Sequence, residues 1–221
     1  PRLLVGIDEE GGKVRRLSGD FTTFPSMDLV GRIGSEALAR ELAEAMAAEL
    51  RAIGVNWDFA PVLDVHSNPA NPIIGARALS SDPAVVARLG AVFIDALQGA
   101  GVAACGKHFP GHGDTSLDSH LALPTVEASR ALLDARELVP FRAAARAGVA
   151  SMMTAHVRYP ALDPDHTATL SPAILEGLLR RDIGFEGVVV TDDLEMRAVA
   201  DHATPEALAL ASVEAGADVL L

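Results

Sequence analysis

Short apolar segments alternate with helix-forming segments along the chain, and this alternation constrains the fold more than any other feature. Six apolar runs bounded by turn residues are candidate strands, and they lack the alternating polar residues of a half-exposed sheet. Strands of this kind are typical of a parallel sheet that is covered on both faces. The six runs are residues 3–7, 55–60, 102–105, 149–154, 187–191 and 217–221.

Helices are expected between these runs, and three of them begin with a capping residue followed by proline. Proline at the first helical position loses no hydrogen bond, and its φ angle is already helical. The three pairs are Asp82-Pro83, Ser171-Pro172 and Thr204-Pro205. The second and third helices should end near residues 184 and 216. Apolar residues at helical spacing predict further helices over residues 35–53 and 129–147, and Pro140 should kink or divide the latter.

Polar side chains follow most of the apolar runs directly. Functional groups at the carboxyl ends of many parallel strands are typical of a (β/α)8 barrel. A doubly wound sheet gathers its site at one switch point and usually carries a glycine fingerprint, and no G-x-G-x-x-G follows any run here. We therefore expect an α/β fold, a TIM-type (β/α)8 barrel, with residues 1–221 forming one catalytic barrel domain. Six strands imply that two strand–helix units are absent and that both ends are incomplete.

Residues 107–120 hold an unusual concentration of chemically useful side chains. The segment contains three of the seven histidines, two aspartates and one of the two lysines, together with two glycines and a proline. The glycines and the proline predict a loop without helix or regular strand, and Gly111 and Gly113 should let it move. A polar loop that follows an apolar strand is a frequent place for binding and catalysis.

Two pairs within the chain have the composition of catalytic groups. Asp192 and Asp193 follow a buried strand, where a carboxylate can serve as nucleophile, base or metal ligand, or simply cap a helix. Asp118 and His120 lie two residues apart in the polar loop, so the carboxylate could orient the imidazole as a proton shuttle.

Other polar residues are candidates for binding. Lys107 and His108 would follow a strand and could hold hydroxyl groups or a carboxylate, although an internal ion pair would also explain the lysine. Asp8 should face the mouth of the barrel, and the other charges of residues 8–16 should form a solvated surface. Arg77 follows a Pro/Gly-rich stretch and could reach the same mouth.

Four of the histidines have weaker contexts. His66, His166 and His202 are expected to be structural or exposed, and His156 is intermediate because it follows a strand directly. Cys105 is the only cysteine, so an internal disulfide is excluded while the redox compartment stays open.

The charge and hydropathy of the chain exclude two classes of partner. A formal net charge of −12 argues against a nucleic acid, which is held through a basic surface. No apolar run reaches the roughly 18 residues that a membrane span requires, so no membrane partner is expected.

The motifs closely resemble those of bacterial β-N-acetylglucosaminidases of glycoside hydrolase family 3. The resemblance rests on Lys-His-Phe-Pro-Gly-His-Gly with Asp-Ser-His across residues 107–120, on residues 8–12 and 58–65, and on Thr-Asp-Asp-Leu-Glu-Met at 191–196. It covers nearly the whole chain in the family's order, and implies a (β/α)8 barrel of which this chain spans the third to the eighth strand.

The resemblance also implies a role for individual residues. Asp192 would be the nucleophile, and His120 the acid and base, assisted by Asp118. Lys13 stands where the family often has arginine, which is a departure from the pattern. The sugar-binding positions would be Asp8, Arg16, Arg77, Lys107 and His108.

The implied substrate is a carbohydrate with terminal β-linked N-acetylglucosamine, as in a disaccharide or a muropeptide of peptidoglycan. The implied mechanism retains the anomeric configuration and needs no cofactor and no metal. The β-glucosidase branch lacks the Asp-Ser-His loop, which favours the hexosaminidase branch. A cytoplasmic role in peptidoglycan recycling is the expectation, with export and the oligomeric state left open.

Four alternatives remain at this point. The enzyme could be a β-glucosidase of the same family, or a phosphorylase, since a neutral imidazole base would not repel phosphate. A metal-dependent hydrolase would use His and Asp as zinc ligands, drawn from His108, His112, Asp114, Asp118 and His120. A sugar-binding protein without activity is the fourth possibility.

Overall fold

A curled parallel sheet with helices on its convex side forms the core of the protein. The computed structural model describes residues 3–116 and 123–221. Its five strands pair in the order β1-β2-β3-β4-β7, all parallel. Their bounds are Gly6–Ile7 (β1), Trp57–Asp58 (β2), Ala103–Phe109 (β3), Ser151–Thr154 (β4) and Val188–Val190 (β7). Val219 extends the sheet through a parallel bridge to Val190.

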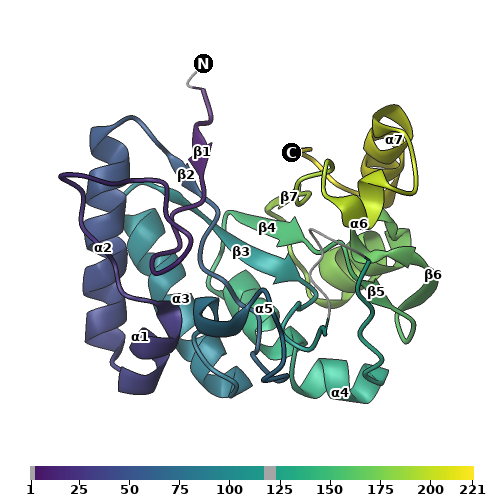
Figure 1. The fold of residues 1–221 in the computed structure, drawn as a ribbon, viewed down its shortest axis with the longest axis horizontal. Helices are drawn as coiled ribbons and strands as arrows, with labels where there is room; N and C mark the ends of the chain where they lie inside the picture. The colour runs from purple at the N-terminus through teal and green to yellow at the C-terminus, as the bar shows by residue number, and fades with distance from the viewer. Residues whose placement is uncertain (1–2, 117–122) are drawn as a thin grey trace.

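The sheet is curved and open, so that the segment with β1 and the segment with Val219 lie at its two edges (Figure 1). Strand follows helix in chain order, as the sequence predicts, and the arrangement is part of a (β/α)8 barrel. Each candidate strand contributes at least one paired residue to this sheet, which confirms the prediction of a parallel sheet.

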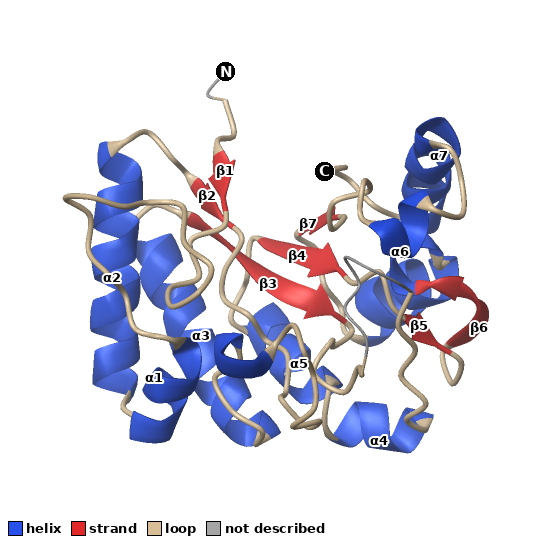
Figure 2. Cartoon of the chain, in the orientation of Figure 1, coloured by secondary structure: helices blue, strands red, loops and turns tan. Residues whose placement is uncertain are grey.

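Helices cover the outer side of the sheet (Figure 2). The expected caps form: the side chains of Asp82, Ser171 and Thr204 accept hydrogen bonds from backbone N–H groups at the starts of α3, η3 and α7. Ser35 does the same for α2. The helices are α1 Met27–Ile33, α2 Glu36–Ala52, α3 Pro83–Gly99, α4 Arg130–Ala135, α5 Leu138–Arg146, η3 Ala173–Asp182, α6 Arg197–Ala200 and α7 Pro205–Ala215, with short 3-10 turns η1 Gly75–Arg77 and η2 Ala168–Leu170. None of the helices in the described ranges is long and apolar enough to cross a membrane.

The predicted helix over residues 129–147 is divided, but not at Pro140. The break falls at Arg136 and Glu137, between α4 and α5, so Pro140 is the third residue of α5. In the first turn of a helix the backbone N–H has no partner within the helix, so proline costs nothing there.

β3 is longer than expected and includes part of the polar segment 107–120. Gly106 suggests the end of a strand, but it lies inside β3. A glycine is needed at this position because a Cβ would stand 2.6 Å from Cδ1 of Leu63. The strand runs on to Phe109, so the prediction of a loop throughout residues 107–120 is wrong for its first three residues. Lys107 and His108 therefore belong to the sheet itself.

A second, antiparallel pair of strands lies outside the barrel sheet. β5 (Arg158–Tyr159) pairs with β6 (Asp163–Thr167) in a hairpin that the sequence does not predict. Three of the five residues of β6 are exposed and polar or proline, so the segment has no apolar alternation that would indicate a strand.

Two apolar layers stabilise the fold. The larger lies between the sheet and the helices and includes Leu50, Phe93, Phe141 and Leu179. The smaller joins side chains from successive strands of the sheet, namely Trp57, Phe59, Cys105, Met153 and Val190. Alternate residues of β3 divide between them, since Ala104 belongs to the first layer and Cys105 to the second.

Cys105 is fully buried in the smaller layer, which raises the pKa of its thiol to about 12. We expect the thiol to be unreactive in the folded protein, because reagents attack the exposed thiolate. A disulfide reagent added at pH 8 should modify no cysteine in the native chain and one cysteine in denaturant, read by absorbance. Modification of the native chain at the rate of a free thiol would contradict this burial.

Candidate active site

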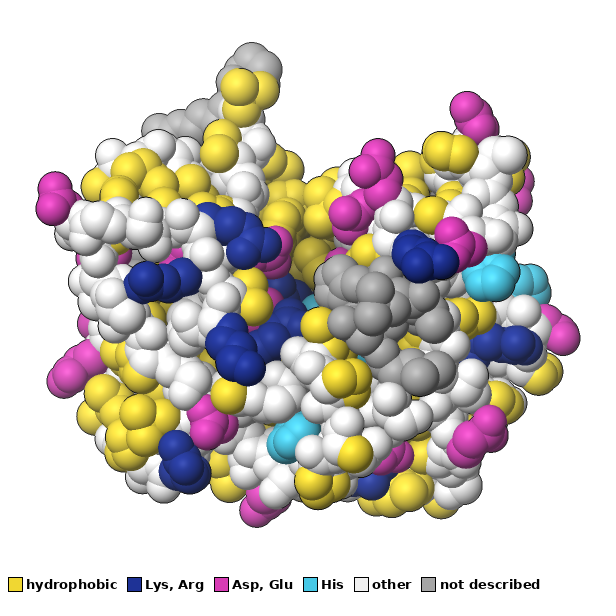
Figure 3. All heavy atoms as spheres, in the orientation of Figure 1, with side chains coloured by type: hydrophobic (Ala, Val, Ile, Leu, Met, Phe, Trp, Pro, Cys, Tyr) yellow, Lys and Arg dark blue, Asp and Glu magenta, His cyan; other side chains and the backbone are white. Residues whose placement is uncertain are grey.

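A cleft of about 420 Å³ opens at the carboxyl ends of the strands. It receives side chains from the segment after β1, from the η1 turn, from β3 and from the segment after β7. Figure 3 shows Lys and Arg side chains gathered around a hollow in the middle of one face. This is the edge at which (β/α)8 barrels carry their active sites.

Six of the eight predicted site residues lie in the described part of the chain, and all six line this one cleft. They come from four separate segments of the sequence and are brought together only by the fold. The six are Asp8, Arg16, Arg77, Lys107, His108 and Asp192. Asp118 and His120 lie outside the described residues.

Glu10 is at the centre of a buried network of charges. Its Oε1 lies 2.6 Å from Nζ of Lys107, and its two carboxylate oxygens each accept a hydrogen bond of 2.8 Å from Arg77. Lys107 also donates to Asp8 over 2.6 Å. The internal ion pair considered for Lys107 is therefore present, and it fixes the ammonium group at the wall of the cleft.

The expectation of a solvated surface for residues 8–16 is wrong for Glu9 and Glu10, whose exposed fractions are 1% and 2%. Glu9 accepts hydrogen bonds from the backbone N–H groups of Arg16 and Leu17, so it holds the segment that carries Arg16. The carboxylates belong inside because each is matched by donors that replace water.

The network holds its members in their charged forms. Burial alone would raise the pKa of Glu10, but Lys107 and Arg77 outweigh burial and lower it to about 2. Burial alone would lower the pKa of Lys107, but Glu10 and Asp8 raise it above its ordinary value. A fully charged lysine, 1% exposed, thus presents its remaining donor capacity to the cleft.

Asp64 orients His108. Its Oδ2 lies 2.7 Å from Nδ1 of His108, and its Oδ1 accepts from the backbone N–H groups of His108 and His112 at 3.2 and 2.6 Å. Burial alone would raise the pKa of Asp64, but the two histidines and these bonds lower it. The ionised carboxylate accepts a hydrogen bond from Nδ1–H of His108. This bond orients the ring so that Nε2 of His108 lies toward Arg77, 3.4 Å away.

The glycines after His108 serve close packing in this structure. A Cβ at Gly113 would stand 1.7 Å from the carbonyl oxygen of Val65, and a Cβ at Gly111 would stand 2.8 Å from Cγ of Glu137. His112, between them, is buried and its Nδ1 lies 2.8 Å from Oγ1 of Thr115. Residues 111–113 are thus packed against the barrel, and the movement predicted from these glycines is not what they provide here.

Asp192 enters the cleft from the segment after β7. Burial alone would raise the pKa of its carboxyl, but His108 and the backbone N–H of Asp193 lower it below its ordinary value. That N–H donates to Oδ1 over 3.0 Å. Asp192 is therefore an ionised carboxylate in a mostly enclosed position, as a nucleophile must be.

Asp8 and Arg16 lie at the more open side of the cleft. Their side chains approach to 3.7 Å and are 33% and 56% exposed. Oδ1 of Asp8 is held by Lys107, but within the described residues Oδ2 and the Arg16 guanidinium make only this long contact, so they can accept from and donate to hydroxyl groups of a ligand.

Two residues of the site, Glu10 and Asp64, are missing from the predicted site residues, and His112 is predicted only as a possible zinc ligand. Glu10 and Asp64 each follow an apolar segment, and that position is the signal that would have identified them. His166 and His202 are exposed, as expected, while His156 is fully buried near Asp192. Among residues 3–116 and 123–221, no three His, Cys, Asp or Glu side chains are arranged to hold a metal ion.

The fold and the cleft together define a class: a (β/α)-barrel domain whose polar, charged site lies at the carboxyl edge of its sheet. The model of the glycosyl hydrolase family 3 N-terminal domain matches residues 1–221. The chain belongs to this family, in agreement with the resemblance of its motifs.

Relatives support the same assignment. A β-hexosaminidase A of Pseudoalteromonas piscicida is 39% identical over 99% of this chain, and a β-hexosaminidase of Neisseria meningitidis serogroup A is 41% identical over all of it. Among solved structures, a glycoside hydrolase family 3 β-N-acetylglucosaminidase from Paenibacillus sp. str. FPU-7 superimposes with a TM-score of 0.98 at 50% identity over the whole chain.

A second similar structure contains a sugar analogue. It is NagZ from Neisseria gonorrhoeae in complex with N-trifluoroacetyl-D-glucosamine, which has a TM-score of 0.90 and 40% identity over 99% of this chain. The chain spans only part of each relative: 39% and 63% of the two hexosaminidases, 42% of the Paenibacillus enzyme and 65% of NagZ.

Proposed function

We propose that the protein is a retaining exo-β-N-acetylglucosaminidase that removes terminal β-linked N-acetylglucosamine. The observation that carries the proposal is the position of Asp192, an ionised carboxylate in a cleft that Lys107, His108 and Arg77 also line. Relatives named β-hexosaminidase and β-N-acetylglucosaminidase support this choice of sugar.

The first step of the proposed reaction forms a covalent intermediate. A carboxylate oxygen of Asp192 attacks the anomeric carbon, and the bond from that carbon to the leaving oxygen breaks. His120, with Asp118 beside it in the sequence, gives a proton to the leaving oxygen. In the second step, water attacks the anomeric carbon, gives a proton to His120 and frees Asp192, so two inversions retain the configuration.

The remaining residues would hold the sugar while this happens. Lys107 and Arg77 are charged donors, and Asp8 is an acceptor, so together they fit the hydroxyl groups of a pyranose. His108 and Arg16 complete the set. Fixing the sugar ring against Asp192 lowers the entropic part of the activation barrier, because the reacting atoms are already held in the correct orientation.

The proposed natural substrate is a peptidoglycan fragment, either a disaccharide or a muropeptide, handled by one catalytic barrel domain in the cytoplasm. The relative crystallised with N-trifluoroacetyl-D-glucosamine supports recognition of an N-acylated glucosamine.

The test is an assay of the purified chain with 4-nitrophenyl β-N-acetylglucosaminide beside the corresponding glucoside. We expect release of 4-nitrophenol from the first at a kcat/KM at least about tenfold above the second, since one unmatched polar group costs more than 1 kcal/mol. Preference for the glucoside would reject the hexosaminidase proposal.

Product analysis in phosphate buffer should give free sugar, and a sugar phosphate would instead indicate a phosphorylase. Loss of activity in EDTA would favour a metal hydrolase.

A further inference from the structure

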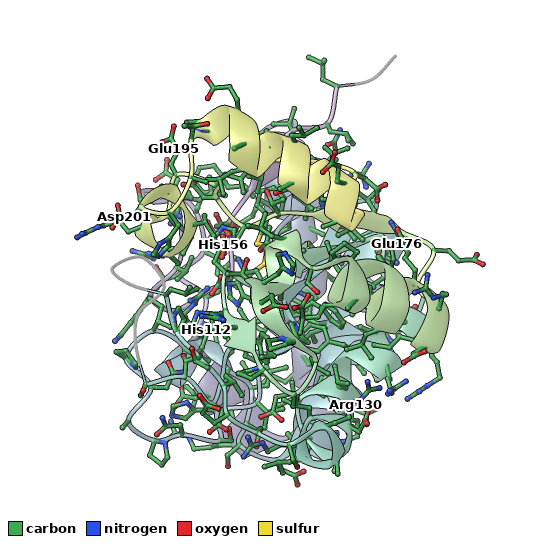
Figure 4. All side chains as sticks on the ribbon, turned by 90° about the vertical axis from the view of Figure 1, so that its right-hand side faces the viewer. His112, Arg130, His156, Glu176, Glu195 and Asp201 are labelled. Carbon is green, nitrogen blue, oxygen red and sulfur yellow. The ribbon has the colours of Figure 1, made fainter. Side chains whose placement is uncertain are left out.

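His156 is a buried imidazole next to the segment that carries Asp192. It lies two residues beyond the end of β4 and has no exposed surface, and Figure 4 shows it in the interior while Glu195 and Asp201 lie at the periphery. Its Nε2 lies 2.9 Å from the backbone carbonyl oxygen of Asp193, and its Nδ1 lies 2.7 Å from Oγ1 of Thr169.

The partners determine where the protons lie. A carbonyl oxygen only accepts, so Nε2 of His156 must carry a hydrogen and donate it to Asp193. Burial lowers the pKa of His156, so the ring is neutral and Nδ1 is an acceptor. The hydroxyl of Thr169 then donates to Nδ1, and it can itself accept from the hydroxyl of Thr154, 2.8 Å away. Each polar group in this chain of hydrogen bonds is satisfied.

This series of hydrogen bonds is connected to Asp192, the proposed nucleophile, through Asp193. The carbonyl oxygen of Asp193 receives both His156 and the backbone N–H of Met196, at 2.9 and 3.1 Å. The N–H of the same residue donates to Oδ1 of Asp192. Moving Asp193 would therefore move the donor that holds the carboxylate in the cleft.

The other side of the segment is held by hydrogen bonds with the last strand, one of which runs from the N–H of Leu221 to Oγ1 of Thr191. The N–H of Thr191 donates to Val219, and the N–H of Leu194 donates to Leu221. These bonds fix the edge of the segment along the sheet but do not contact Asp193. Among the described residues, the hydrogen bond from the His156 side chain joins Asp193 to the interior of the barrel, and the other side-chain bonds of Asp193 and Asp192 stay within their own segment.

We propose that His156 is a positioning residue: its Nε2–H, directed by Thr169, fixes the Asp192–Asp193 backbone so that the Asp192 carboxylate points at the anomeric carbon. The role acts through Asp192 and so rests on the proposed function. Histidine suits it because a neutral ring offers one donor and one acceptor at opposite sides, which joins Thr169 to Asp193 without adding a charge.

The kinetic test compares two substitutions of the same residue. His156→Leu removes the donor, and we expect kcat to fall by roughly 10- to 100-fold, since a displacement near 1 Å costs about that much. KM and the affinity for free N-acetylglucosamine should change less than about threefold, because the groups that hold the sugar remain. His156→Gln places an N–H near the position of Nε2 and should recover most of kcat. His166→Leu, an exposed histidine, is the matched control.

These outcomes separate positioning from a purely structural role. If His156 only stabilised the fold, both variants would lower the unfolding temperature and leave kcat of the folded fraction unchanged. That result, or equal losses of kcat in His156→Leu and His156→Gln, would overturn the inference.

A measurement without turnover keeps the inference testable if the proposed function fails. Nitrogen NMR of the ¹⁵N-labelled chain should find His156 with a proton on Nε2, none on Nδ1, and no titration between pH 6 and 8. Absence of turnover in the unmodified chain would reject the proposed function alone. A proton on Nδ1, or a cationic ring at pH 7, would reject the hydrogen-bond chain on which the inference rests.

Discussion

Replacing Asp192 with alanine should lower kcat by at least about 10⁴-fold, while the affinity for N-acetylglucosamine stays within about threefold of the original value. The first effect follows because the carboxylate that forms the covalent bond is gone, and losses of this size are typical when a nucleophile is removed. The second follows because Asp8, Arg77 and Lys107 still line the cleft. Steady-state assay and titration calorimetry measure the two quantities.

An added nucleophile makes this prediction specific. Azide can enter the space left by the Asp192 side chain and attack the anomeric carbon from the same face. The product should then be the α-glycosyl azide, of inverted configuration, whereas the unmodified chain should release the β-anomer of the sugar. Asp182→Ala is the control, because that carboxylate is exposed and is not among the residues that line the cleft. Full activity of Asp192→Ala would remove this residue from the mechanism.

Replacing Glu10 with alanine should lower the free energy of unfolding by about 3–5 kcal/mol, the usual cost of removing one partner from a buried ion pair. Lys107 would keep Asp8 as a partner, but Arg77 would lose both of its bonds to a carboxylate. Denaturant titration measures the loss. Glu10→Gln preserves the volume and should fold even where the alanine variant does not, with a smaller destabilisation.

An exposed ion pair provides the matched control for Glu10. Glu36 lies 3.0 Å from Arg88, and both side chains are largely in solvent. Glu36→Ala should cost no more than about 1 kcal/mol, because water screens exposed charges. Similar losses for the two alanine variants would mean that the buried network does not stabilise the protein.

The same network should make stability depend on pH in the acid range. The pKa of Glu10 is about 2 in the folded chain and has an ordinary value of 4.5. A lowered pKa stabilises the folded form above the unfolded value, and this contribution, about 3 kcal/mol, is lost as pH falls from about 4.5 to about 2. In Glu10→Gln, the free energy of unfolding should therefore fall less steeply across this range.

The sequence predicts the elements whose signals are local. The caps at Asp82 and Thr204 lie next to the prolines that follow them, so three or four residues suffice to place each helix start. The strands are likewise marked by short apolar runs, which can be recognised from neighbouring residues alone. The division before Pro140 is also local, although the exact break depends on how α5 packs.

The site could be predicted only in part, because its decisive contacts are long-range. Glu10 looks like a surface charge in its own segment, and only Arg77, 67 positions later, and Lys107 make its burial favourable. Asp64 is comparable, since the histidine that it orients lies 44 positions away. The resemblance to a known family identified Asp192 and the sugar-binding candidates, but it gave no information on what holds them.

The charged lining of the cleft differs from the rest of the protein. Among the described residues that line it, four carboxylates face four cationic side chains, although the chain as a whole carries a net charge of −12. An uncharged sugar there meets short-range hydrogen bonds and little net potential, so dissolved salt should hardly alter its binding. The acidic outer surface and the balanced charges of the cleft are thus independent of each other. Surface charges can change, in evolution or by engineering for solubility, without altering the affinity for the sugar.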